Sequence, residues 1–215
     1  MRLSMRISVN NNIIEVSGQR PLIEELREVG IPVPSMCYGP ERSEIKEVRD
    51  EIVHHPSCMV CMVKDVKTGQ MLPSCSVLPY EGMEIETDSD EVLHLRRMSL
   101  ELLLSDHKIR CGVCEGKEKC RLRDLALQMG AKWVRYGKIS PLVNDEQIHV
   151  NGHLYYEPAK CIRCGLCVYN TQDGFTFDRR GFNMRVVIPE ESKKNVSEQI
   201  AQLCPTGALF LRTAP

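Results

Sequence analysis

The chain has 215 residues, with 28 lysines and arginines against 29 aspartates and glutamates and a formal net charge of −1. This balance leaves no basic excess to neutralise phosphates, which argues against a general nucleic-acid-binding protein. No apolar run reaches the length of a signal-peptide core or a membrane span, so we expect a cytoplasmic protein of one large domain or two to three small ones.

The first 87 residues are predicted to combine short strands with one helix. Residues 5–9 and 13–16 alternate apolar and polar side chains around three asparagines, which predicts a β-hairpin. A helix is expected to begin at Pro21 and to end near Gly30. Further strands are expected at residues 61–66, 70–73 and 82–87. Two strands and a helix followed by cysteine-bearing loops form the element order of a β-grasp ferredoxin.

Four cysteines of this region are candidate metal ligands: Cys37, Cys58, Cys61 and Cys75. Plant-type 2Fe-2S ferredoxins place four residues before their C-x2-C pair, whereas twenty residues separate Cys37 from Cys58 here. Within this insertion, residues 41–53 are charged with apolar side chains at helical spacing, and they form either a solvated short helix or an element that docks a partner. His54 and His55 follow, but we do not expect them to be ligands because four thiols already complete the site.

The middle of the chain is predicted to contain two helices. The first begins at Asp88 or Ser89 and ends at Ser105 and Asp106. Its apolar face is expected to comprise Val92, Leu93, Leu95, Met98, Leu102 and Leu103. The second follows Cys120 and is expected to end at Gly130. Its inward-facing residues are expected to be Leu122, Leu125, Ala126 and Met129.

Between these helices stand three cysteines with C-x2-C-x5-C spacing, Cys111, Cys114 and Cys120, shortly after His107. A lone histidine after a helix is usually structural or solvated. These three cysteines otherwise lack a fourth ligand, so we predict that His107 completes the site. One short segment then supplies enough soft and borderline donors to enclose a metal centre.

The C-terminal part is predicted to begin with a hairpin, because residues 147–150 and 153–156 flank an Asn-Gly turn. Its two histidines, His149 and His153, are expected on the surface. The hairpin leads to a C-x2-C-x2-C group formed by Cys161, Cys164 and Cys167. Such a group is typical of a 4Fe-4S cubane, which needs three thiolates from one tight loop and a fourth from elsewhere. We predict that Cys204 is the fourth, presented by a helix over residues 197–203.

Eleven cysteines and His107 make twelve donors, which divide into three sets of four with no thiol left over. An odd number of cysteines in a reducing compartment opposes disulfides. We therefore predict three iron–sulfur clusters in a row. One alternative is a structural zinc-binding scaffold, although zinc sites favour pairs of C-x2-C. Another is a dedicated enzyme, but the sequence signals no open coordination site, flavin, Gly-rich dinucleotide fingerprint or nucleophile–base pair.

Several motifs are highly specific in combination. They are Ile31-Pro-Val-Pro with Cys37, Cys58-Met-Val-Cys61 with Cys75, Gly82-Met, His107 to Cys120 followed by Arg121-Leu-Arg-Asp-Leu-Ala126, and Cys161-Ile-Arg-Cys164-Gly-Leu-Cys167 with Cys204-Pro-Thr-Gly-Ala208. In these motifs the whole chain resembles the N-terminal, three-cluster portion of the large iron–sulfur (G, or 75 kDa) subunit of NADH:quinone oxidoreductase, respiratory complex I. It is also similar to the diaphorase small subunit of NAD-linked hydrogenases and to electron-input domains of FeFe hydrogenases and NAD-linked formate dehydrogenases.

The resemblance implies an α+β fold with a β-grasp 2Fe-2S ferredoxin-like domain at residues 1–88, a helical His/Cys3 domain at 89–145 and a 4Fe-4S ferredoxin-like domain at 146–215. It implies three clusters, with 2Fe-2S on Cys37, Cys58, Cys61 and Cys75, 4Fe-4S on His107, Cys111, Cys114 and Cys120, and 4Fe-4S on Cys161, Cys164, Cys167 and Cys204.

The same resemblance implies two kinds of partner. One is a flavin-containing subunit that oxidises NAD(P)H, and the other is a terminal redox enzyme, with electrons passing singly in either direction between them. Because no domain for terminal chemistry follows Cys204, we expect that chemistry on another polypeptide. The gap from Cys37 to Cys58 is longer than is usual in the complex I subunit family.

Overall fold

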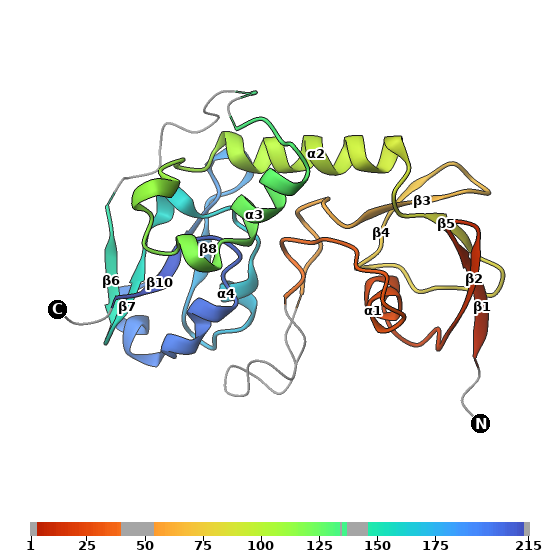
Figure 1. The fold of residues 1–215 in the computed structure, drawn as a ribbon. Helices are drawn as coiled ribbons and strands as arrows, with labels where there is room; N and C mark the ends of the chain where they lie inside the picture. The colour runs from red at the N-terminus through yellow and green to blue at the C-terminus, as the bar shows by residue number, and fades with distance from the viewer. Residues whose placement is uncertain (1–3, 40–53, 134, 137–145, 213–215) are drawn as a thin grey trace. The chain divides into compact units, whose positions relative to one another are not determined.

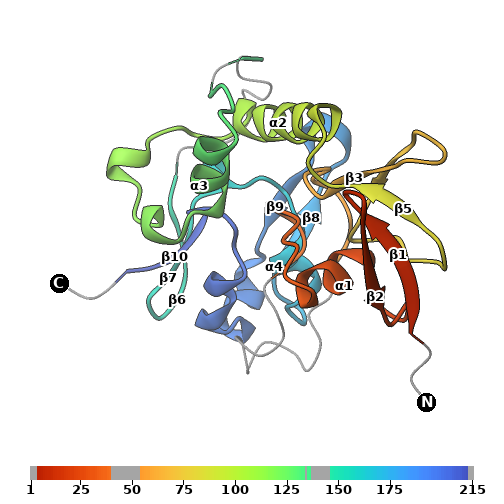
Figure 2. The same ribbon diagram turned by 45° about the vertical axis from the view of Figure 1, so that its right-hand side comes forward.

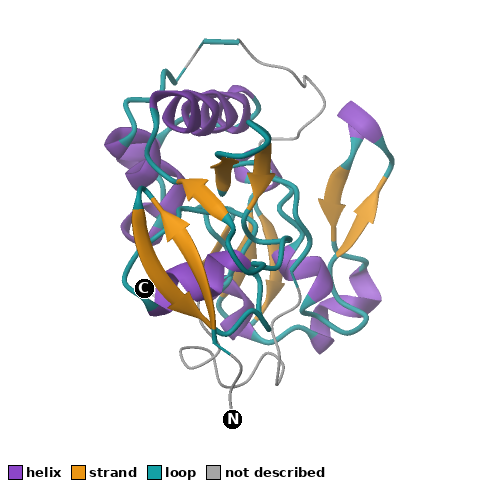
Figure 3. Ribbon diagram, turned by 90° about the vertical axis from the view of Figure 1, so that its right-hand side faces the viewer, coloured by secondary structure: helices purple, strands orange, loops and turns teal. Residues whose placement is uncertain are grey.

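The computed structural model describes residues 4–39, 54–133, 135–136 and 146–212 (Figure 1). The charged segment at residues 41–53, for which a short helix is predicted, lies outside these ranges. The chain divides into two compact units. The first comprises Met1–Ser35 and Cys58–Ser99, and the second comprises Met36–Ser57 and Leu100–Pro215. Helices and strands occur in both units (Figure 3), as the predicted α+β class requires.

The first unit is built on a five-stranded sheet with the order β2-β1-β5-β3-β4. Its strands are β1 (Met5–Val9), β2 (Asn12–Val16), β3 (Met62–Asp65), β4 (Met71–Pro73) and β5 (Glu84–Glu86). The hairpin β1–β2 and the antiparallel pair β3–β4 confirm the predicted strands, and β1 and β2 lie side by side in Figure 2. The sequence pattern did not predict that β5 inserts between the two pairs, parallel to β1 and antiparallel to β3.

Helix α1 (Leu22–Glu28) begins after Pro21 as predicted. Its apolar face is fully buried, and Gly30 has the positive φ expected just beyond a helix C-terminus. The backbone N–H groups of Leu22 and Ile23 donate to the carbonyls of Val77 and Ser74, at 2.8 and 2.9 Å. These bonds satisfy two of the unpaired donors of the first helical turn and fix the loop that carries Cys75.

Helix α2 (Asp90–Ser105) has the predicted position but not the predicted apolar face. Of the six expected residues only Val92 is fully buried, and Leu102 is 46% exposed. The buried stripe instead includes Arg96, Ser99, Leu100, Glu101 and Leu104. The prediction was wrong because it treated the polar side chains as solvent-facing, whereas Arg96 and Ser99 are buried with hydrogen bonds to backbone carbonyls.

The second unit contains α3 (Arg121–Gln128), α4 (Leu166–Tyr169) and two small sheets. The predicted helix after Cys120 is confirmed as α3, with Leu122 and Ala126 buried. One sheet has the order β10-β7-β6, formed by β6 (Ile148–Asn151), β7 (Leu154–Tyr156) and β10 (Leu209–Leu211), so the predicted hairpin is confirmed. The other pairs β8 (Thr176–Asp178) with β9 (Arg185–Val187). The expected helix before Cys204 is a 3₁₀ helix, Glu198–Gln202.

The core of this unit is formed by apolar side chains from β6, β7, β10 and the 3₁₀ helix before Cys204. Leu154, Tyr156 and Leu166 are among its most deeply buried members. The sulfur-bearing side chains of Cys161, Cys164, Cys167 and Cys204 pack against this core. The four predicted ligands of the C-terminal site therefore lie directly on the hydrophobic core of the second unit.

Candidate metal centres

Four predicted ligands of the middle site surround one cavity. The cavity is lined by His107, Cys111, Cys114 and Cys120, together with four basic residues, Lys108, Arg110, Lys117 and Arg123. Its empty volume, including space open to solvent, is about 240 Å³. Two 3₁₀ turns, Cys111–Val113 and Lys117–Lys119, form the loop, and α3 begins immediately after Cys120. The short loop thus brings three thiols to the histidine that follows α2.

His107 has the environment of a metal-binding histidine. The residue is 8% exposed, and its ring Nδ1 lies 3.0 Å from the backbone carbonyl oxygen of Lys160. A carbonyl can only accept, so Nδ1 carries the hydrogen and the lone pair resides on Nε2. Burial lowers the pKa of His107 and thereby favours the neutral ring that a metal requires. The Lys160 carbonyl fixes both the tautomer and the ring orientation.

The four predicted ligands of the C-terminal site line a second cavity. Cys161, Cys164, Cys167 and Cys204 border an empty volume of about 340 Å³, whose remaining walls include Tyr156, Ile162, Leu166, Val186 and Leu209. Burial raises the pKa of the Cys161 and Cys167 thiols, so these thiols are protonated in the metal-free chain. Loading with iron must therefore release their protons.

Gly165 in the C-x2-C-x2-C group has no room for a side chain. Its φ is +79°, and an added Cβ would lie 2.6 Å from the ring of Tyr169. Glycine adopts this left-handed conformation without steric cost. The turn of the backbone at Gly165 begins α4, which carries Cys167.

The loops of the two cavities are joined within the second unit by several direct contacts. The backbone N–H of Lys108 donates to the Ala159 carbonyl at 2.8 Å, and the Asp106 carboxylate forms an ion pair with Arg163. Gly207, in the Cys204-Pro-Thr-Gly segment, packs so closely that an added Cβ would lie 2.6 Å from the Cys114 sulfur. The sequence assigns this segment to the C-terminal site, yet its glycine contacts a predicted ligand of the middle site.

The four predicted 2Fe-2S ligands are divided between the two units. In the first unit Cys58, Cys61 and Cys75 are buried, and the sulfurs of Cys61 and Cys75 are 3.3 Å apart. In the second unit the Cys37 sulfur lies 3.4 Å from the backbone nitrogen of Ser57. The rings of His54 and His55 are stacked on Tyr38 and Tyr169, respectively.

A buried cation accompanies the thiols of the first unit. The Arg96 guanidinium donates twice to the Met62 carbonyl, at 3.0 and 2.6 Å, and it interacts electrostatically with the adjacent Cys61. Burial lowers the pKa of Arg96 to about 10, so the side chain stays charged at neutral pH.

The donor chemistry and the cavities fit iron–sulfur clusters. No disulfide joins any of the eleven cysteines, all of which lie in the described ranges. Among the residues that the structure describes, no group of three or more His, Cys, Asp or Glu side chains is arranged around a single metal ion. An iron–sulfur cluster holds its ligands further apart than a single metal ion does, because its inorganic core lies between them. Each of the two cavities is bordered by four thiol or imidazole donors, as such a cluster requires.

Comparison with known families defines the class of protein. A 2Fe-2S iron–sulfur cluster binding domain matches residues 3–90, and the iron–sulfur binding region of NADH-ubiquinone oxidoreductase G matches residues 96–135. A 4Fe-4S single cluster domain matches residues 154–211. The chain is therefore an iron–sulfur protein with both 2Fe-2S and 4Fe-4S domains, and this part of the sequence-based prediction is confirmed.

The individual relatives are subunits of NAD(P)-linked enzymes. The chain is 27% identical over 95% of its length to the NADP-reducing hydrogenase subunit HndD of Solidesulfovibrio fructosivorans, of which it spans 36%. It is 23% identical to the mitochondrial NADH-ubiquinone oxidoreductase 78 kDa subunit of Candida albicans, of which it spans 28%. It thus spans about a third of the length of these two relatives. The NAD-reducing hydrogenase HoxS subunit gamma of Cupriavidus necator is 24% identical, and the match covers 97% of this chain and 87% of that one.

A solved structure establishes the same fold. The crystal structure of the NAD+-reducing NiFe-hydrogenase in the H2-reduced state contains a chain that matches with a TM-score of 0.82 and 23% identity, over 99% of this chain and 89% of that chain. The predicted resemblance to the complex I subunit and to the hydrogenase diaphorase subunit is confirmed. Along nearly its whole length the chain is similar to subunits of NAD(P)-reducing hydrogenases and of NADH-ubiquinone oxidoreductase. Within the described ranges, no helix combines the length and the apolar character needed to cross a membrane.

Sequence spacing did not single out Lys160, Glu157 or Tyr156. All three are buried between or beside the cysteine loops. In the sequence, Lys160 stands out only because it directly precedes Cys161. Since lysine side chains are ordinarily exposed to solvent, that position did not predict a buried residue.

Proposed function

We propose that the chain relays single electrons through one 2Fe-2S and two 4Fe-4S clusters. The electrons pass between a flavin-containing, NAD(P)H-oxidising subunit and a partner redox enzyme, which is a hydrogenase, a formate dehydrogenase, a transhydrogenase or a complex I-like enzyme. The proposed ligands are Cys37, Cys58, Cys61 and Cys75 for 2Fe-2S, His107, Cys111, Cys114 and Cys120 for one 4Fe-4S, and Cys161, Cys164, Cys167 and Cys204 for the other. The domain limits proposed from the sequence, 1–88, 89–145 and 146–215, and a cytoplasmic location accompany this proposal.

The observation that carries the proposal is the pair of cavities, each bordered by four of the proposed ligands. When bound, thiolate-ligated clusters supply one-electron chemistry at a potential that is set by ligands, hydrogen bonds and burial. The residues of the chain provide the rest. His107 is oriented by the Lys160 carbonyl, and apolar side chains such as Ile162 and Leu166 exclude water from the C-terminal cavity. The names of the relatives support an NAD(P)-linked partner.

The first test is the metal content of anaerobically prepared protein. We expect about ten iron atoms per chain and a matching amount of acid-labile sulfide. We also expect co-purification of a flavin-containing subunit that oxidises NAD(P)H. Colourless protein with stoichiometric zinc would refute the proposal and support the zinc scaffold.

His107 provides the residue-level test. His107→Cys should retain a 4Fe-4S centre with a lower reduction potential, because a thiolate adds negative charge beside the iron. His107→Ala should degrade that centre alone, with the other two signals still detectable by electron paramagnetic resonance. If both variants leave all three signals and potentials unchanged, His107 is not a ligand.

A further inference from the structure

One backbone carbonyl, that of Lys160, is shared by the loops of the two cavities. It accepts hydrogen bonds from the ring Nδ1 of His107 and from the hydroxyl of Thr206, both at 3.0 Å. A carbonyl oxygen has two lone pairs, so these two donors use its full capacity. The amide that follows is held as well, because the Cys161 N–H donates to the Pro158 carbonyl at 3.0 Å. The peptide group between Lys160 and Cys161 is therefore fixed at both of its polar ends.

The Thr206 hydroxyl is buried, and its orientation follows from its neighbours. Only 3% of the residue is exposed, and the backbone N–H of Ala208 donates to its Oγ1 at 3.1 Å. The hydroxyl therefore accepts from Ala208 and directs its single hydrogen at the Lys160 carbonyl, which can only accept. Because threonine is branched at Cβ, few rotamers are open to it. The hydroxyl thus holds the carbonyl from the side opposite to the donors of the middle-site loop.

A competing partner for this hydroxyl belongs to the C-terminal site. The Cys204 sulfur lies 3.6 Å from the Thr206 Oγ1, and Thr206 follows Cys204 by two positions. The simplest interpretation of the side chain is therefore a role at the C-terminal cluster. However, Cys161 and Cys204 have backbone bonds of their own, since the Cys204 N–H donates to the Ala201 carbonyl at 3.3 Å. The two interpretations differ in which cluster is weakened when the hydroxyl is removed.

The ring of His107 depends on the shared carbonyl more directly. An imidazole has two nitrogens, and if Nε2 is the ligand then Nδ1 is the one remaining atom through which a hydrogen bond can orient the ring. That bond goes to the Lys160 carbonyl. A shift of the carbonyl therefore turns the ring or breaks the bond that orients it.

We propose that Thr206 is a positioning residue for His107. Its hydroxyl holds the Lys160 carbonyl in the place from which that carbonyl orients the imidazole as a ligand of the middle cluster. The proposal rests on the function proposed above. Thr206 thus stands in the Cys204-Pro-Thr-Gly motif of one site and serves a ligand of the other.

Thr206→Val tests the proposal in the full, anaerobically prepared, cluster-loaded protein. Valine keeps the branched shape and removes the hydroxyl. Loss of an outer-shell partner of a metal-binding histidine weakens metal affinity by about 10–100-fold. Thr206 acts through one further bond, so we expect the lower end of this range, an approximately tenfold faster loss of the middle cluster to an iron chelator. Electron paramagnetic resonance follows each cluster separately.

A second measurement reports on the ring itself. The magnetic coupling between the middle cluster and the imidazole nitrogen, measured by electron spin echo modulation, depends on how the ring is oriented. It should change in Thr206→Val. Thr206→Ser keeps the hydroxyl and should restore both this coupling and the stability of the middle cluster.

Thr171→Val is the matched control. The Thr171 hydroxyl makes the same two kinds of bond, because it donates to the Cys167 carbonyl at 2.8 Å and accepts from the Phe175 N–H at 3.1 Å. This variant loses equivalent hydrogen bonds near the C-terminal site but leaves the Lys160 carbonyl with both of its donors. The stability and the nitrogen coupling of the middle cluster should be unchanged.

Earlier loss of the middle cluster in Thr206→Val, with Thr206→Ser like wild type, supports the proposal. Loss of the C-terminal signal first, or equal loss of both 4Fe-4S signals, would overturn it, because the hydroxyl then serves Cys204 or the junction of the loops. An unchanged middle cluster would overturn it too. If Thr206→Val does not fold, Thr206→Ala removes the same bonds without the apolar branch and is judged in the same way. Wild-type protein without iron would instead refute the proposed function, so the two failures are distinguishable.

Discussion

Gly207 should control the middle cluster, although it belongs to the Cys204-Pro-Thr-Gly segment of the C-terminal one. In Gly207→Ala the new Cβ would lie 2.6 Å from the Cys114 sulfur and 3.2 Å from the Gly116 Cα. The backbone of Gly207 is not left-handed, so the substitution acts by steric clash and not by backbone strain. Overpacking of this kind costs about 1–3 kcal/mol. That cost is about a fivefold to 150-fold shift toward a form in which Cys114 is displaced.

The assay is cluster content and the resonance signal of each cluster in anaerobically prepared protein. We expect the middle signal to be lost or shifted and the C-terminal signal to remain. Gly112→Ala is the control, because Gly112 lies in the middle-site loop itself, yet its added Cβ meets no atom within 4 Å. The reasoning is refuted if Gly207→Ala damages only the C-terminal cluster, or if Gly112→Ala is equally disruptive.

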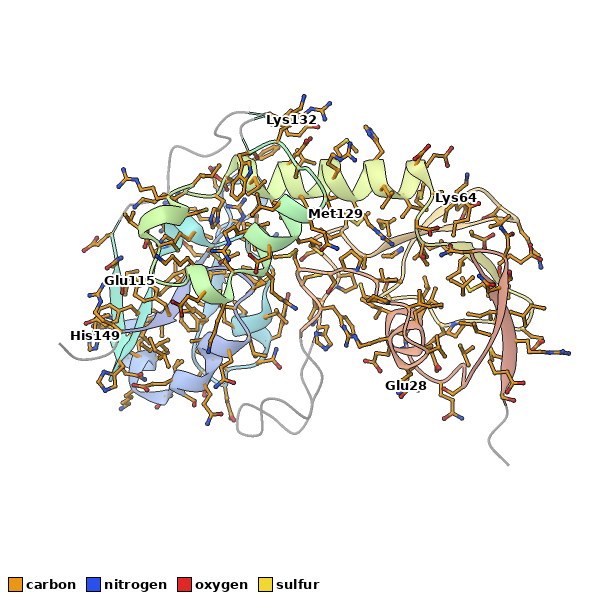
Figure 4. The ribbon with its side chains drawn as sticks, in the orientation of Figure 1. Glu28, Lys64, Glu115, Met129, Lys132 and His149 are labelled. Atoms are coloured by element: carbon orange, nitrogen blue, oxygen red, sulfur yellow. The ribbon has the colours of Figure 1, made fainter. Side chains whose placement is uncertain are left out.

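Two further substitutions test the surroundings of the sites. Tyr156→Phe removes a buried hydroxyl that donates to the Val186 carbonyl at 3.0 Å, so it should cost about 1–3 kcal/mol of stability. An unchanged free energy of unfolding in chemical denaturation would contradict this. Burial raises the pKa of Glu101, but hydrogen bonds from the backbone of Lys132 (Figure 4) and from Arg135 outweigh it and lower the pKa. The hydrogen bonds of Glu101 therefore stabilise the fold above about pH 4.3, the pKa of an unfolded glutamate. This stabilisation is lost as pH falls through the lower pKa of Glu101 in the folded state. Glu101→Gln should cost only about 1 kcal/mol at pH 7, because Arg135 is 44% exposed and solvent screens its charge. The difference in denaturation midpoint between variant and wild type should narrow as pH falls below about 4.3. A difference that stays constant as pH falls would count against the ion pair.

Most of the strands and helices predicted from the sequence are present, because each depends on short-range regularities. Alternation of apolar and polar residues sets β1 and β2, and glycines mark the ends of α1 and α3. The spacing of cysteines within a loop limits where their thiols can point, so that His107 and the three cysteines after it border one cavity. The fourth donor of the C-terminal cavity, Cys204, is distant in sequence, but the Cys-Pro pattern singled it out.

The buried face of α2 could not be predicted in the same way. Leucines occur around most of this helix, so hydrophobicity does not select one side. The side that is buried carries Arg96 and Glu101, each of which is compensated by groups far away in the sequence. Only tertiary structure supplies such partners, and a polar residue is counted as exposed until they are known.

The same limit explains why the sequence named candidate ligands but not the residues that surround them. A ligand motif concerns one loop and one metal centre. Lys160 and Gly207 instead lie in or beside the motifs of the C-terminal site, yet they approach His107 and Cys114, respectively, of the middle site. Their positions became meaningful only when the loops were found to be joined, through His107 to the Lys160 carbonyl and through Asp106 to Arg163. A substitution near one set of cysteines should therefore be assayed at both proposed 4Fe-4S clusters, because residues in the loop of one cavity contact predicted ligands of the other.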